Sequence, residues 1–167
     1  MGSPLGVAFA NFYMTHIENT VFDNNPSLKP RIYCRYIDDC FLLLDNANQV
    51  HEIIRAFQES SVLTFIHEIG LNNTINFLDV AIDNSGNSFS TTTYKKPTNP
   101  GHYINSISEC PFRYKENTIK ALINRTYKIA SDENLFSLAI DRLKQTFINK
   151  TLHLIEFFIN FWKKPET

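Results

Sequence analysis

Hydrophobic side chains recur every four residues near the start of the chain. Five residues share this spacing and fall on one stripe of an α-helix: Leu5, Phe9, Tyr13, Ile17 and Val21. Ser3 can cap such a helix, and Pro4 suits its first position. The pattern predicts a helix that ends near Phe22, followed by a polar loop.

Two strand-forming runs, residues 31–35 and 40–44, flank the segment Tyr36-Ile37-Asp38-Asp39. They predict a tight antiparallel hairpin with both carboxylates at its tip. Neighbouring side chains of a regular strand point to opposite faces, so only a turn directs both acids toward one site.

The next segments alternate between helical and strand patterns. Apolar positions over residues 50–57 predict a second amphipathic helix, with Asn46 and Gln49 as a capping box. Three further strands are predicted at residues 63–67, 75–82 and 89–94. The order of elements predicts an α+β fold, with an antiparallel sheet backed by two helices.

Beyond Pro97 the pattern becomes helical. Apolar spacing predicts helices at residues 119–130, 135–143 and 151–164, after an irregular connector. We therefore expect two domains, residues 1–97 with the sheet and residues 98–167 with the helices.

Composition indicates a folded protein, with 43% hydrophobic residues. Three cysteines without metal-ligand spacing favour a reduced, intracellular protein, with nucleus and cytoplasm left open. The most apolar stretch, residues 152–162, is interrupted by Glu156 and Asn160 and is shorter than the roughly 20 residues of a membrane span. We expect no membrane association.

Charge is unevenly distributed along the chain. Residues 1–94 contain four Lys/Arg and ten Asp/Glu, whereas residues 95–128 contain seven Lys/Arg and two Glu. The basic segment is typical of a surface that follows phosphates. Its candidate nucleic-acid-binding residues are Lys95, Lys96, Lys115 and Lys120. An ordinary solvated helix face is the alternative, and Lys95 and Lys96 could instead protect an exposed sheet edge.

The Asp38–Asp39 pair is the candidate metal site. Clustered carboxylates repel each other unless a hard cation neutralises them. Mg²⁺, with Mn²⁺ as a substitute, takes such oxygen ligands. The alternative is a solvated turn that only ends a strand.

Several ordered segments resemble the reverse transcriptases of Penelope-like retroelements over roughly residues 1–145. The segments are Gly2-Ser3-Pro4-Leu5-Gly6 with Ala10-Asn11-Phe12-Tyr13-Met14, then Tyr36-Ile37-Asp38-Asp39, Phe77-Leu78-Asp79-Val80 and Tyr94-Lys95-Lys96-Pro97-Thr98. The region of Ser108, Pro111 and Lys115 is similar to the helical thumb side of that family.

The resemblance implies a partial polymerase palm followed by a thumb-like helical segment. It implies nucleotidyl transfer by two Mg²⁺ ions, with an RNA template, a DNA primer and deoxynucleotides as partners. Asp38 would be the main catalytic metal ligand and Asp39 its support, while Gly2 and Ser3 would form the floor under the nucleotide. Tyr36 would pack near the primer end, or be a half-buried aromatic of the sheet.

Two further residues have competing interpretations. Asp79 could be mistaken for a catalytic acid, but a structural hydrogen-bonding role is favoured. His67 could donate a proton to the leaving pyrophosphate, although an ordinary surface histidine is the simpler interpretation.

The chain also departs from that family. The strand that supplies a further metal-binding aspartate, the fingers and a GIY-YIG endonuclease have no counterpart here, and the apolar tail near Phe157 matches nothing in it. Two hypotheses follow. The chain is a reverse transcriptase fragment that acts only in association with the missing parts, or it is an inactive remnant that at most binds nucleic acid.

Overall fold

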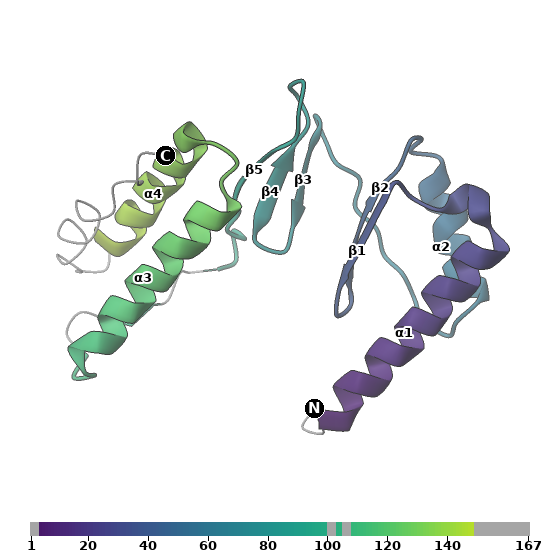
Figure 1. Ribbon diagram of the computed structural model, residues 1–167, viewed down its shortest axis with the longest axis horizontal. Helices are drawn as coiled ribbons and strands as arrows, with labels where there is room; N and C mark the ends of the chain where they lie inside the picture. Colours follow the sequence, from purple (N-terminus) through teal and green to yellow (C-terminus); the bar gives the residue numbers. More distant parts are fainter. Residues whose placement is uncertain (1–3, 100–102, 105–107, 149–167) are drawn as a thin grey trace. The chain divides into compact units, whose positions relative to one another are not determined.

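The computed structural model describes residues 4–99, 103–104 and 108–148 (Figure 1). These residues form an α+β fold with four α-helices and two small antiparallel sheets. The chain divides into two compact units, Met1–Ile69 and Gly70–Thr167, and each is considered by itself.

Unit 1 consists of two helices and a hairpin. Its elements are α1 (Pro4–Asn24), the short 3₁₀ helix η1 (Pro26–Leu28), β1 (Ile32–Tyr36), β2 (Asp39–Leu43) and α2 (Gln49–Glu59). The core lies where α1 meets α2 and is formed by Ile17, Val21, Ile53 and Phe57. Hydrophobic contact between the two helices therefore holds this unit together.

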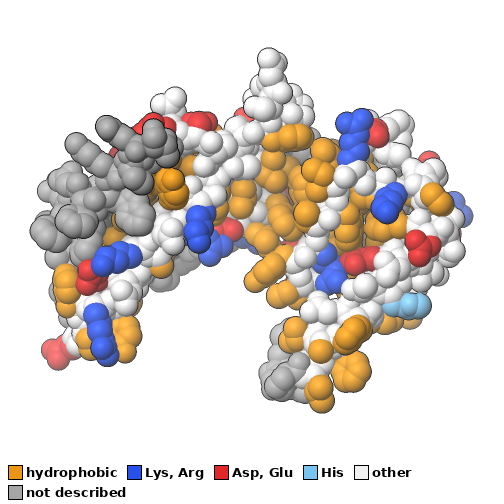
Figure 2. All heavy atoms as spheres, in the orientation of Figure 1, with side chains coloured by type: hydrophobic (Ala, Val, Ile, Leu, Met, Phe, Trp, Pro, Cys, Tyr) orange, Lys and Arg blue, Asp and Glu red, His pale blue; other side chains and the backbone are white. Residues whose placement is uncertain are grey.

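Only the C-terminal half of the predicted α1 stripe is buried. Ile17 and Val21 are each 1% exposed, whereas Leu5, Phe9 and Tyr13 are exposed. Figure 2 shows hydrophobic side chains along this N-terminal part of α1. Regular spacing identifies the helix, but the rest of unit 1 covers only its last turns.

The predicted hairpin at residues 31–44 is confirmed. β1 and β2 pair antiparallel, with Tyr36 opposite Asp39, so Ile37 and Asp38 form a two-residue turn. Ile37 has a φ of 60°, a left-handed conformation that a β-branched residue rarely adopts. Nη1 of Arg35 donates a hydrogen bond to the Ile37 carbonyl at 3.1 Å, which helps to hold this turn.

Unit 2 joins a three-stranded sheet to two helices. Its elements are β3 (Thr74–Phe77), β4 (Val80–Asp83), β5 (Ser90–Thr93), α3 (Phe112–Ile129) and α4 (Glu133–Ile148). The strands lie in the order β3-β4-β5. The helices pack around Ile119, Ile123, Ile140 and Phe147.

Backbone and hydroxyl hydrogen bonds attach β5 to the turn between α3 and α4. The Ser131 N–H donates to the Thr91 carbonyl at 3.0 Å, and the Thr91 N–H donates to Ser131 Oγ at 3.1 Å. Thr91 Oγ1 also donates to the Ile129 carbonyl at 2.5 Å. The sheet therefore fixes the end of α3 and the start of α4.

Three details of the sequence prediction are wrong. Residues 63–67 do not form a strand, because they pair with no described strand and Phe65 instead packs edge-on against Phe57 at 5.2 Å. Residues 75–82 form two strands, since Leu78 adopts a φ of 56° and turns the chain back. The strands form two separate sheets, β1-β2 and β3-β4-β5, instead of one.

The predicted capping box of α2 is also wrong. Asn48 precedes the helix without a side-chain capping bond, and Asn46 Oδ1 instead accepts a hydrogen bond from the Asn48 N–H at 2.9 Å. Asn46 thus stabilises the turn before the helix rather than its first turn.

The units divide at Ile69 and Gly70, whereas the composition of the chain changes after Pro97. The assignment of residues 1–97 and 98–167 to two domains stays a prediction. The predicted helix at 151–164 lies outside the described residues, as do Gly2 and Ser3. Within the described part of the chain, no helix is long and apolar enough to cross a membrane.

Candidate nucleic-acid interface

One face of α3 carries an array of cations and amides. It consists of Arg113, Tyr114, Asn117, Lys120, Ala121, Asn124, Arg125 and Lys128, all of them exposed, and we call it the α3 face. These residues follow helical spacings of three, four and seven positions. Figure 2 shows Lys and Arg side chains along α3. The only acid in α3 is Glu116, which is half-buried.

The opposite side of α3 is buried and fixes the direction of the α3 face. Ile119, Ile123 and Thr126 are 2%, 3% and 5% exposed. The buried Thr126 hydroxyl donates a hydrogen bond to the Leu122 carbonyl at 2.9 Å. Because Ile119 and Ile123 make the core side of the helix mainly apolar, the charged residues gather on the solvent side.

Two cations of the α3 face have carboxylate partners. Lys120 Nζ lies 2.7 Å from Glu116 Oε1, one helical turn away. Arg125 Nε is paired with Asp79 in the turn between β3 and β4. The Arg113 guanidinium lies 5.2 Å from the centre of the Tyr114 ring, a cation–π geometry. Because these contacts lie at the surface, each cation can exchange its partner for a DNA phosphate at a low cost in free energy.

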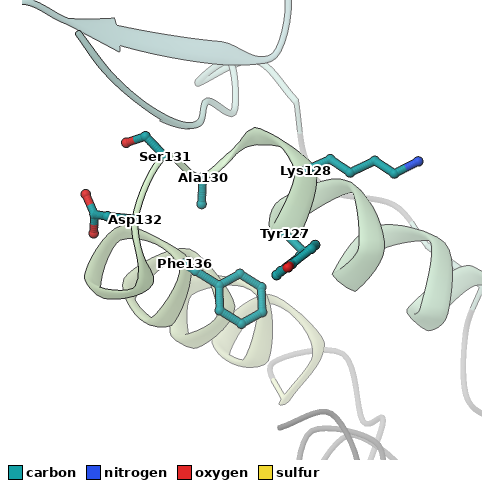
Figure 3. Close-up of a pocket in the computed structure, with 6 residues that line it drawn as sticks. All are labelled: Tyr127, Lys128, Ala130, Ser131, Asp132 and Phe136. Atoms are coloured by element: carbon teal, nitrogen blue, oxygen red, sulfur yellow. The ribbon is translucent and has the colours of Figure 1, made fainter. Parts of the chain in front are cut away.

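A three-residue turn, Ala130 to Asp132, connects α3 to α4. Asp132 Oδ1 accepts a hydrogen bond from the Leu135 N–H at 2.9 Å and so caps α4. Figure 3 shows the rings of Tyr127 and Phe136 next to each other between the helices, packed edge to face with centres 5.7 Å apart. Two helices joined by so short a turn form a helix-turn-helix arrangement.

An open hollow of about 350 Å³ lies at this turn, bordered by the residues in Figure 3. Its border contains one cation, Lys128, and one acid, Asp132. The two formal charges cancel, so the hollow has no net charge to attract phosphate. The candidate interface is therefore the α3 face and not the hollow.

The model of the animal helix-turn-helix domain matches residues 102–151. This helix-turn-helix segment contains the whole of α3 and α4. No curated protein and no solved structure matches the chain. The predicted membership of the reverse transcriptase family is wrong, because the match is to a domain of DNA-binding type and no reverse transcriptase is found.

The four lysines predicted from the sequence fall into two groups. Lys95 and Lys96 are exposed just after β5. Lys120 lies on the α3 face, whereas Lys115 is half-buried and donates to the Ser108 carbonyl at 2.7 Å. Lys115 thus holds the segment that precedes α3. Lys120 lies on the α3 face with Arg113, Arg125 and Lys128, which were not among the predicted binding residues.

Asp38 and Asp39 lie at the hairpin tip and are exposed, as is Tyr36. No group of three or more potential metal-ligating side chains occurs within residues 4–99, 103–104 and 108–148. Two carboxylates would leave most positions of an octahedral Mg²⁺ ion to water, so the tip provides an incomplete ligand set. Mg²⁺ binding stays a prediction.

A partly buried polar network joins the hairpin to α1. Arg35 forms an ion pair with Glu18, and each side chain is only 13% exposed. Arg35 also donates to Asn11 Oδ1 at 3.0 Å and to Thr15 Oγ1 at 3.3 Å. The three α1 partners are spaced by four and three residues, so they share one helix face. The helical spacing of Asn11, Thr15 and Glu18 is visible in the sequence and could have identified this polar face of α1.

Tyr33 and Cys40 complete that network. The Tyr33 hydroxyl donates to Glu18 Oε1 at 2.8 Å and lies 3.4 Å from Cys40 Sγ. Burial, assisted by the contacts with Cys40 and Glu18, raises the pKa of Tyr33 well above its ordinary range. Burial also raises the pKa of the Cys40 thiol, which makes it a poor nucleophile. The network therefore has a structural role.

The structure shows where the two residues with competing interpretations lie, and a catalytic role for His67 stays untested. Asp79 lies in the turn after β3 and forms the ion pair with Arg125, which agrees with the structural role favoured for it. The His67 ring is exposed and contacts His51 with ring centres 5.3 Å apart. All three cysteines are free.

Proposed function

We propose that the chain binds duplex DNA through its helix-turn-helix segment, residues 102–151. The observation that carries the proposal is the α3 face, which is exposed, contains four cations and lacks an acid. The match to an animal helix-turn-helix domain supports the same function independently of charge.

The physical basis is phosphate neutralisation. An α-helix fits the major groove, and cations along its solvent side meet phosphates while counterions are released. The α3 face extends from Arg113 to Lys128, about 22 Å at 1.5 Å per residue. That length is sufficient to follow several base pairs.

Fluorescence anisotropy of a labelled duplex, with the full chain titrated at stepped salt concentrations, tests this function. We expect affinity to fall linearly with salt on logarithmic axes, and Arg113→Glu with Lys128→Glu to weaken binding more than tenfold. Lys29→Glu with Arg55→Glu is the matched control, because it makes the same charge change in unit 1. Equal weakening by both double variants would contradict the proposal, since only net charge would then matter.

Palm-and-thumb architecture, nucleotidyl transfer and the partners that they imply stay predictions from the sequence. No contact or comparison described above supports them, and the DNA-binding proposal depends on none of them.

A further inference from the structure

We infer that α3, the first helix of the pair, is the helix that reads DNA sequence, with Asn117 and Asn124 recognising A·T base pairs in the major groove. The inference rests on the proposed function and adds which helix reads the DNA and what it recognises. In the usual helix-turn-helix arrangement the second helix lies in the groove and its first residues contact the bases.

Charge around the start of α4 opposes that usual arrangement. Asp132 caps α4 with its side chain, and Glu133 follows in the first turn. Both residues are exposed. A base-reading position between two phosphate backbones would place these carboxylates against like charge. Asp141, further along α4, is also exposed, but Lys144 Nζ lies 3.0 Å from its Oδ1, so the opposing charge is concentrated at Asp132 and Glu133.

The centre of the α3 face has the composition of a base-reading surface. Asn117 and Asn124 are exposed and separated by seven residues, so they project from the same side of the helix. Ala121 lies between them, and its small side chain permits a close approach of the helix to the base edges. An asparagine amide can accept a hydrogen bond from adenine N6 and donate one to adenine N7, and both atoms face the major groove.

Cations flank this central row and would position the helix. Arg113 and Lys120 lie on one side of the row, and Arg125 lies on the other. Contacts of this kind fix the register of a helix on the duplex without reading sequence. The face therefore combines both kinds of contact that a recognition helix requires.

The spacing of the two asparagines predicts the spacing of their targets. Seven residues correspond to about 10.5 Å along the helix. This is about three base-pair steps of duplex DNA at roughly 3.4 Å each. We expect a preferred site with two A·T pairs about three steps apart.

Selection of bound sequences from a randomised duplex pool, performed with the full chain, tests the inference. The wild type is compared with Asn117→Ala, Asn124→Ala and the control Asn134→Ala, which removes an exposed amide from α4. We expect each α3 variant to lose about tenfold preference at one of the two A·T pairs. Asn134→Ala should retain the wild-type site, and circular dichroism should be unchanged in all variants.

The outcomes separate the inference from the proposed function. A preferred site that is unaffected by both α3 variants, or that is lost in Asn134→Ala, overturns the role of α3. Salt-dependent binding without any preferred site overturns the inference and leaves the proposed function intact. Absence of binding to every duplex overturns the proposed function itself.

Discussion

Arg125 of α3 is paired with Asp79, which lies 46 residues earlier in the turn between β3 and β4. The Arg125 and Asp79 side chains are 62% and 36% exposed, so water screens much of their attraction. The pair connects the sheet of unit 2 to the α3 face and partly neutralises one of its cations.

Replacement of Asp79 by Asn should therefore strengthen DNA binding. We expect a severalfold increase in affinity for DNA, because Arg125 no longer has to break its ion pair before it contacts a phosphate. The free energy of unfolding should fall by less than about 1 kcal/mol, because the pair is exposed. Anisotropy titration and urea unfolding measure the two quantities. Asp83→Asn in the same unit is the control for charge, since Asp83 binds the Ser85 N–H and not α3. An equal gain in both variants would exclude a specific effect on Arg125.

The partly buried Arg35–Glu18 pair should be far more important for stability. Arg35→Met leaves the Glu18 carboxylate without its cation in a site only 13% exposed. We expect the free energy of unfolding to fall by about 3 kcal/mol. The control is Arg55→Met, which breaks an ion pair whose side chains are 80% and 64% exposed and should cost less than about 1 kcal/mol. Similar losses in the two variants, measured by urea unfolding, would contradict the structural role of the network.

Stability should decline in alkaline solution because Tyr33 and Cys40 have raised pKa values in the native state. In the unfolded chain these groups ionise near their ordinary values, about 10 and 8.5. Above those values the unfolded state binds fewer protons than the native state, so the free energy of unfolding falls as pH rises. Below about pH 7 both groups are protonated in the native and the unfolded state, so they add no pH dependence.

Urea unfolding between pH 7 and pH 10.5 measures this decline. Tyr33→Phe should make it shallower, whereas Tyr36→Phe, which alters an exposed tyrosine, should leave it unchanged. An equally steep decline in the Tyr33→Phe variant would show that other groups are responsible.

The sequence predicts elements well where one regular pattern determines them. The spacing from Leu5 to Val21 locates α1, and the runs around Asp38 locate the first hairpin. The hairpin of β3 and β4 is missed because its turn contains Leu78 at positive φ, and no glycine, asparagine or proline marks that position.

The candidate site is only partly predictable for a related reason. The basic composition of residues 95–128 is visible in the sequence, but the selection of Lys120 over Lys115 depends on which side of α3 is buried. The ion pair of Arg125 with Asp79 depends on how the chain folds between the sheet and α3, which local sequence patterns do not determine. Local motifs that resemble a polymerase suggested the wrong family, because short segments fix neither fold nor function.

The most direct test of DNA binding through the α3 face is chemical-shift mapping of the isotope-labelled full chain with a duplex DNA. We predict that the largest backbone amide shifts fall within residues 113–128 and that the side-chain amides of Asn117 and Asn124 shift with them. Largest shifts within residues 133–145, or within unit 1, would contradict the account.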